Sequence, residues 1–315
     1  MDGLPESLRP LATVSCQRTL KSAIAGVGIG LHSGKRVNLV LRPAEANTGI
    51  IFRRTDLGVD IPAQHDNVID TKLCTQLGLR SHPEARVGTV EHLMAAIAAA
   101  GVDNLVIEVD GAEVPVFDGS SAPFLFLIDC AGLAEQSAPR QIIEILQTVR
   151  VDGEAGAFAE LRPAAVGMDM ALSIDFPAAA IGRQALSLAF TERSFRAELA
   201  RSRTFTMLAE IEALQAAGLA RGGSLSNAIV VDGARVVNPE GLRSHDEFVR
   251  HKLLDAVGDL ALAGGPIQGR FLAHKTGHAL NNRLLRAVFA KATNWRIVSA
   301  DAIERAAYTY VARAA

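Results

Sequence analysis

The segment from Glu247 to Leu260 carries polar side chains at a spacing that suits metal binding. At about 100° per residue, a helix places four of them on one face, opposite a run of apolar residues: His251, Lys252, Asp255 and Asp259. An imidazole and a carboxylate one helical turn apart can bind the same metal ion. A solvated polar helix face would give the same pattern, so this segment alone does not decide between the two interpretations.

A second histidine, His92, lies near the start of another predicted helix at residues 89–101. If this helix meets the first one, His92, His251 and Asp255 form a set of two imidazoles and one carboxylate. Such a set with an open position is typical of catalytic zinc sites, and Fe²⁺ suits the same ligands. The ion would polarise a carbonyl group and lower the pKa of water toward neutral pH. The chain has no HExxH motif, so it does not match the common metalloprotease helix.

Groups capable of acid–base catalysis accompany this set. Glu91 is a candidate general base, although the helix dipole alone would favour a carboxylate at that position. His278 follows a glycine at a predicted strand-to-helix junction and is either a cationic acid or an ordinary turn residue. Asp259, one turn beyond Asp255, could keep that imidazole protonated, because a nearby carboxylate raises the pKa of histidine. Thr204 could donate its hydroxyl to an oxyanion, or it could cap a helix.

The elements that must position these residues occur in two similar halves. The tetrapeptide Leu41-Arg-Pro-Ala recurs as Leu161-Arg-Pro-Ala. Each copy follows a predicted strand, precedes another strand, and leads to a helix that has a histidine near its start. The common order predicts a duplication. Packing of the halves about a pseudo-twofold axis would bring the two histidine-bearing helices face to face.

The polar segment at residues 131–140 is the predicted boundary between two domains, at residues 1–138 and 139–315. The interval from the repeated tetrapeptide to the histidine is longer in the second domain. This difference predicts an inserted β-α-β unit at about residues 205–238, with a tight turn at Asp232-Gly233.

Helix ends are predicted from residue type. Thr89 is the expected cap of the helix at residues 89–101, with Gly101 at its end, and Ser244 with Glu247 has the spacing of a capping box. The other segments with clear patterns are a helix at 121–130 and strands at 37–41, 50–54 and 105–109.

The composition is that of an ordinary globular protein. The 315 residues carry a formal net charge of −2, which gives no sign of a nucleic-acid partner. Three widely spaced cysteines without a CxxC motif favour reduced thiols and a cytoplasmic setting. No apolar run has the length of a transmembrane helix, so we expect no integral membrane association.

Six segments resemble the motifs of the UDP-3-O-acyl-N-acetylglucosamine deacetylases, which catalyse the committed step of lipid A synthesis in Gram-negative bacteria. These segments are CQRTLKSAIAGVGIGLHSG, VGTVEHLMAA, VPVFDGSSAPF, SRTF, DEFVRHKLLDAVGDL and HKTGHALNNRLLRA. The resemblance implies an α+β fold of two domains with alike topology. Each domain would have a mainly antiparallel sheet, two helices and an insert, packed together as a β-α-α-β sandwich.

The resemblance also implies a role for each matching residue. His92, His251 and Asp255 would bind zinc, with Glu91 as general base, His278 as acid and Asp259 as its orienting partner. Thr204 and Lys252 would contact the reacting group or the substrate, a UDP-sugar that carries an acyl chain. The second insert would form an apolar passage for that chain, and the substrate-binding residues there would include Phe205, Met207, Ile211 and Leu214. Cys74 would lie near the zinc without a catalytic role.

Two other functions remain open at this stage. The same residues suit a zinc amidohydrolase that acts on a different acylated amino sugar, and the fold could also belong to a metal-free binding protein. The complete set of ligand, base and acid residues favours an enzyme. We expect it to be a monomer.

Overall fold

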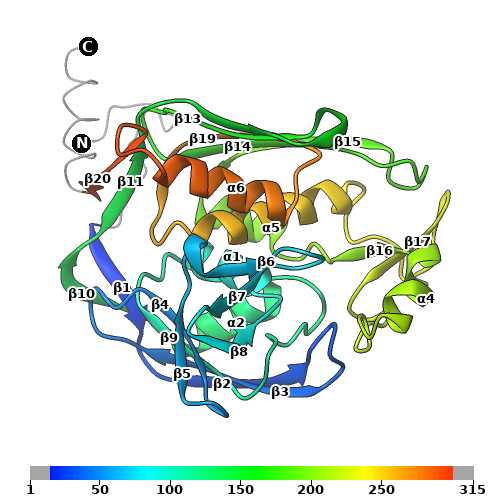
Figure 1. Ribbon diagram of the computed structural model, residues 1–315, viewed down its shortest axis with the longest axis horizontal. Helices are drawn as coiled ribbons and strands as arrows, with labels where there is room; N and C mark the ends of the chain where they lie inside the picture. The colour runs from blue at the N-terminus through cyan, green and yellow to red at the C-terminus, as the bar shows by residue number, and fades with distance from the viewer. Residues whose placement is uncertain (1–14, 301–315) are drawn as a thin grey trace, which may run out of the picture.

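The computed structural model describes residues 15–300, arranged as four layers in which two sheets enclose two layers of helices (Figure 1). The first helix layer holds α1 (Glu91–Ala100) and α2 (Ala122–Ala131). The second holds α5 (Glu247–Ala261) and α6 (His278–Phe289). The predicted α+β class and β-α-α-β order are therefore confirmed.

The two sheets share one order of strands, as the repeated tetrapeptide predicts. The first sheet has the order β2 (Ile24–Ile29), β3 (Arg36–Pro43), β9 (Leu105–Val109), β4 (Ile50–Arg54) and β5 (Val59–Pro62). The second follows the same path through β12 (Val149–Asp152), β13 (Phe158–Arg162), β19 (Ile267–His274), β14 (Met168–Asp175) and β15 (Arg183–Phe190). Along both five-strand paths the neighbours are antiparallel except for one central pair, β4–β9 and β14–β19. The repeated Leu-Arg-Pro occupies equivalent strand ends, at β3 and β13.

Smaller elements complete each half. Two further strands extend the second sheet, β11 (Gln141–Ile145) and β20 (Trp295–Ser299), and β1 (Cys16–Leu20) pairs with β10 (Leu133–Pro139). The first half also holds a small sheet of β6 (Val68–Asp70), β7 (Gln76–Leu79) and β8 (His82–Val87). Short helical turns lie at His65–Asn67, Glu154–Gly156, Glu192–Ser194 and Phe195–Leu199. We propose the domain boundary between residues 138 and 139, at the end of β10.

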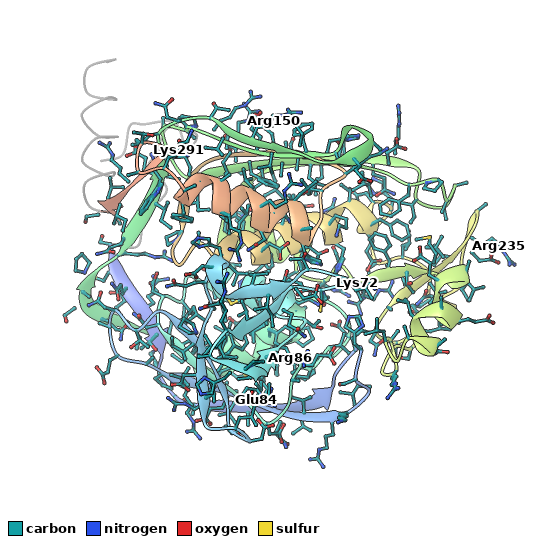
Figure 2. The ribbon with its side chains drawn as sticks, in the orientation of Figure 1. Lys72, Glu84, Arg86, Arg150, Arg235 and Lys291 are labelled. Atoms are coloured by element: carbon teal, nitrogen blue, oxygen red, sulfur yellow. The ribbon has the colours of Figure 1, made fainter. Side chains whose placement is uncertain are left out.

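A β-α-β unit projects from the right-hand side of the view in Figure 1. It consists of β16 (Phe205–Met207), α4 (Leu208–Ala216), β17 (Ile229–Asp232) and β18 (Arg235–Val236), with β16 parallel to β17. Charged side chains such as Arg235 in this unit and Arg150 on the second sheet lie at the periphery (Figure 2). Buried apolar residues fill the space between each sheet and its helices.

The predicted helices and strands are found within two residues of their expected ends, but two predicted caps are wrong. Thr89 has a φ of 56°, and its hydroxyl donates to Glu113 at 3.0 Å instead of capping α1. Glu247 does not form a capping box with Ser244, because its carboxylate accepts hydrogen bonds from Arg203 and Arg243. Gly101 does end α1, with a φ of 68°.

The two helix layers touch where Gly258 of α5 meets the backbone of Glu91. A Cβ atom at Gly258 would lie 2.0 Å from the carbonyl oxygen of Glu91, so only glycine permits this approach. Because α1 and α5 carry His92 and Asp255, this contact sets the distance between the two side chains.

Replacement of Gly258 by alanine should therefore force the two helices apart. Overpacking in a well-packed core costs about 1–3 kcal/mol of unfolding free energy, which urea denaturation would measure. We also expect metal affinity to fall, because the separation of α1 and α5 would change. Gly111→Ala is a useful control, since a Cβ there would meet only Val37, at an ordinary contact distance of 3.8 Å, and the φ of Gly111, like that of Gly258, is not positive. Normal metal affinity in Gly258→Ala would contradict the role given to this contact.

Candidate active site

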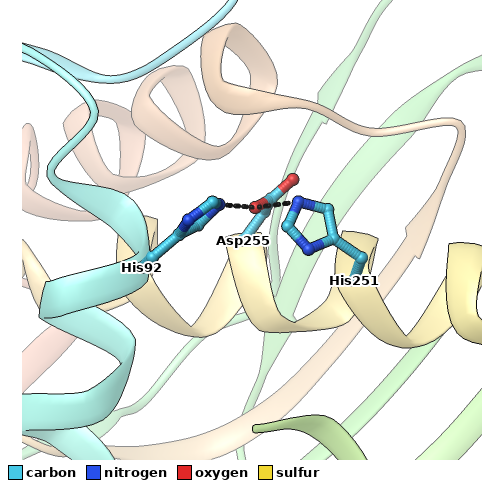
Figure 3. Close-up of side chains that lie close together, drawn as sticks. All are labelled: His92, His251 and Asp255. Carbon is cyan, nitrogen blue, oxygen red and sulfur yellow. Dashed lines mark ion pairs between the residues drawn. The ribbon is translucent and has the colours of Figure 1, made fainter. Parts of the chain in front are cut away.

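Three donor atoms converge between α1 and α5: Nε2 of His92, Nε2 of His251 and Oδ1 of Asp255 (Figure 3). Oδ1 lies 3.6 Å from the His92 nitrogen and 3.3 Å from the His251 nitrogen. Ligand atoms at about 2.0–2.1 Å around a tetrahedral ion lie roughly 3.3–3.5 Å apart, so these spacings fit such an ion. The carboxylate oxygen Oδ1 is buried without a hydrogen-bond partner, as expected of an atom reserved for a metal.

Neighbouring groups determine the protonation states of His251 and Asp255. Nδ1 of His251 lies 3.0 Å from the carbonyl oxygen of Ser202, which can only accept, so Nδ1 carries the proton and Nε2 has a free lone pair. Burial lowers the pKa of His251 to about 4, so the imidazole is neutral. Burial raises the pKa of Asp255, but neighbouring groups outweigh it, among them the charged Lys252, and hold the pKa well below its usual range. A neutral imidazole and an ionised carboxylate are the forms that bind metal ions.

Lys252 contributes a half-buried positive charge to the same helix face. Its Nζ donates to Oδ2 of Asp255 at 2.8 Å, which leaves Oδ1 to face the two imidazoles. Burial lowers the pKa of Lys252, but Asp255 outweighs it, so the net shift is upward and the ammonium group stays charged.

A second group of side chains joins Glu91, His278 and Asp259. Nδ1 of His278 donates to Asp259, with Oδ2 at 2.9 Å, and Nε2 lies 3.7 Å from Oε1 of Glu91. Asp259 also accepts hydrogen bonds from the Thr75 hydroxyl at 2.6 Å and the Asn281 amide at 2.8 Å. These contacts hold the His278 ring between two carboxylates.

The electrostatics suit one acid and one base. Burial lowers the pKa of His278, but Asp259 and Glu91 outweigh it and raise the pKa to about 9. Burial raises the pKa of Glu91, and the nearby His278 opposes that shift. At neutral pH the imidazole is therefore a cation that can donate a proton, and the carboxylate of Glu91 is a stronger base than an exposed one.

The comparisons with known proteins agree with this chemistry. The model of the LpxC family, UDP-3-O-acyl N-acetylglycosamine deacetylase, matches residues 17–290. The chain belongs to this deacetylase family. Its members hydrolyse an amide, so the chain is an amidohydrolase.

Curated relatives cover nearly the whole chain. The relative from Glaesserella parasuis is 50% identical over 289 residues, which are 90% of this chain and 94% of that protein. The relative from Acidithiobacillus ferrooxidans is 50% identical over 295 residues, 92% of this chain and 95% of that protein. Both carry the name UDP-3-O-acyl-N-acetylglucosamine deacetylase.

A cavity of about 290 Å³ opens onto both groups of side chains. Besides the three donor residues, it is lined by most of the residues that the sequence singled out: Cys74, Glu91, Thr204, Phe205, Lys252 and His278. Met207, Ile211 and Leu214 do not line it and lie half-buried in the projecting unit. The candidate site thus lies between the two helix layers and beside that unit.

Cys74 has no sign of reactivity in this cavity. Its thiol is free, and burial together with the charge of Glu91 raises its pKa to about 12. The thiol is therefore protonated at neutral pH and is neither a ready ligand nor a nucleophile.

Within residues 15–300, no helix has the length and apolar character needed to span a membrane.

Several residues of the site were not predicted from the sequence. Thr75 and Asn281 bind Asp259, Ser202 orients His251, and Phe176 and His32 line the cavity. Asn281 belongs to the GHALNN segment, so the motif itself was the available signal. Ser202 and His32 likewise belong to the SRTF and CQRTLKSAIAGVGIGLHSG segments, whereas Thr75 and Phe176 lie outside all six segments and had no recognisable pattern.

Proposed function

We propose that this amidohydrolase removes the N-acetyl group of a UDP-3-O-(3-hydroxyacyl)-N-acetylglucosamine and releases acetate, the committed step of lipid A synthesis. The observation that supports it best is the placement of the His92, His251 and Asp255 donor atoms within 4.8 Å of one another, beside the Glu91–His278 pair. The names of the relatives supply the substrate class. We further propose that the enzyme acts in the cytoplasm of a Gram-negative bacterium as a monomer.

His92, His251 and Asp255 would hold zinc, or Fe²⁺, through two nitrogen atoms and one oxygen atom. When bound, the ion supplies Lewis acidity toward the acetyl carbonyl and toward water. Lys252 steadies the Asp255 ligand and brings positive charge to the cavity.

The chain's own residues then move the protons. Glu91, as the ionised base, takes a proton from the attacking water, and the hydroxyl of Thr204 donates a hydrogen bond to the developing oxyanion. His278, as the cation, donates its proton to the departing amine nitrogen. Asp259 keeps the His278 ring charged and oriented throughout.

An acetate-release assay tests the proposed activity. The protein should release acetate from the acylated UDP-sugar, lose this activity when a chelator removes the metal, and regain it with zinc. Release from another acylated amino sugar alone would favour a different amidohydrolase. Binding of the UDP-sugar without any acetate release would favour a binding protein on the same fold.

The pH profile tests the acid and the base together. Activity requires an ionised Glu91 and a protonated His278, so kcat should rise with pH, stay high, and fall near the His278 pKa of about 9. Asp259→Asn removes the charge that raises the pKa of His278, so the falling limb should move to lower pH. The limbs belong to the coupled site, because Glu91 and His278 interact directly.

The matched control for this profile is Asp103→Asn, which alters a half-buried carboxylate that binds Arg140 away from the cavity. The falling limb of the kcat profile of Asp103→Asn should stay at the same pH as in the unaltered protein. His278→Ala should lower the rate and flatten the limb. An unchanged falling limb in His278→Ala would remove this residue from the acid role.

The projecting unit is proposed to hold the acyl chain through Phe205, Met207, Ile211 and Leu214. Leu214→Glu should lower kcat/KM more for long-acyl than for short-acyl substrates. The binding free energy of the acyl chain should weaken by about 0.8 kcal/mol for each CH₂ group that is no longer buried. Leu208→Glu is the control, because Leu208 lies on the same helix but is 44% exposed. Equal losses for both chain lengths would contradict an acyl passage in this unit.

A further inference from the structure

Arg203 and Glu247 form a buried ion pair next to the site, and no step described above uses it. Their side chains are 1% and 0% exposed. Nε and Nη2 of Arg203 donate to the two oxygens of Glu247 at 3.0 and 3.1 Å. The remaining donors of the guanidinium reach Glu240 at 2.7 Å and the carbonyl oxygen of Gly241 at 2.8 Å.

The pair joins two parts of the site through the backbone. Arg203 lies between Ser202 and Thr204 in the chain. The carbonyl oxygen of Ser202 accepts a hydrogen bond from Nδ1 of His251, and Thr204 lines the cavity. The backbone nitrogen of Arg203 also donates to Glu247 at 2.9 Å. Glu247 lies one helical turn before His251 on α5, so both ends of the contact between Ser202 and His251 are anchored to one carboxylate.

A buried ion pair such as Arg203–Glu247 is better suited to orienting neighbouring groups than to stabilising the fold. A buried ion pair adds little stability over an apolar pair of similar volume, because both charges lose their hydration. Its forked hydrogen bonds, however, fix direction as well as distance. Apolar packing at this place would leave the Ser202 carbonyl free to rotate away from the imidazole.

We propose that Arg203 and Glu247 are positioning residues that orient the His251 imidazole toward the metal and the Thr204 hydroxyl toward the substrate. This inference rests on the proposed metal-dependent function. It adds that the pair determines metal affinity and kcat through the 202–204 segment, without touching the metal or the substrate.

Arg203→Lys keeps the charge and loses the fork. We expect it to lower zinc affinity about 10- to 100-fold, measured by competition with a chromophoric chelator, as do other changes to residues that orient metal ligands. kcat should fall by a similar factor while KM stays within about twofold, because the Thr204 hydroxyl acts on the developing oxyanion rather than on the bound substrate. The double variant Arg203→Met/Glu247→Gln removes both charges and should show the same losses with a nearly normal melting temperature.

Arg54→Lys is the matched control. Arg54 is also buried, and it binds the carboxylate of Asp56 at 2.6 and 2.9 Å and the carbonyl oxygen of Arg86 at 2.7 Å, but it lies in β4. Zinc affinity and kcat should be normal in this control. Normal values in Arg203→Lys, or losses no larger than those of Arg54→Lys, would overturn the proposal. If His251→Ala also binds zinc normally, the metal site itself is wrong; if only Arg203→Lys does, the positioning role alone fails.

Discussion

Replacement of Glu91 by glutamine is expected to lower kcat about 10²–10⁴-fold, the usual contribution of a positioned general base. Glutamine has the same shape, and its side-chain oxygen can still accept the hydrogen bond that the backbone nitrogen of Thr75 donates to Glu91 at 3.0 Å. It cannot take a proton from water. The metal ligands remain in place, so bound zinc, measured by atomic absorption, should equal that of the unaltered protein.

Glu160→Gln provides the control for this change. Glu160 is also buried, at 4% exposure, but it lies in β13 with Arg150 and Arg162 as its partners. Its replacement should leave kcat within a few fold. A near-normal kcat in Glu91→Gln would show that this carboxylate only serves the start of α1.

Periodicity predicted the polar face of α5 because two of the three donor residues, His251 and Asp255, lie on one helix with Lys252 and Asp259. The repeated tetrapeptide predicted the second helix at the site, since duplicated halves place equivalent elements face to face. Both arguments use local pattern and symmetry, which a single sequence contains. The predicted duplication also accounts for the order of strands that the two sheets share.

The caps show why other features could not be predicted. Thr89 and Glu247 have the residue types of helix caps, but tertiary partners use both side chains instead: Glu113 binds Thr89, and Arg203 binds Glu247. The close approach at Gly258 likewise depends on a backbone atom far away in the chain. Local propensity describes only the hydrogen bonds that a side chain can form within its own segment. A contact with a distant segment can replace such a bond, and the local sequence does not show this.

Replacement of His251 by alanine should abolish tight zinc binding and, with it, nearly all deacetylase activity. His251 supplies one of three donor atoms, and its Nε2 is held toward Asp255 by the bond from Nδ1 to the Ser202 carbonyl oxygen. Without it, one imidazole and one carboxylate remain, too few to hold the ion in a tetrahedral site. Lys252 cannot replace it, because its ammonium group is charged and already bound to Asp255.

Thermal unfolding measures this loss independently of turnover. A ligand that binds only the folded state adds about 2.7 kcal/mol of stability at a concentration 100 times its Kd. Zinc should therefore raise the Tm of the unaltered protein and leave that of His251→Ala unchanged. His245→Ala is the control, since this imidazole precedes the same helix but its side chain is 91% exposed, and its Tm should rise with zinc as in the unaltered protein. A full zinc-dependent rise in Tm together with normal acetate release in His251→Ala would mean that other residues hold the metal.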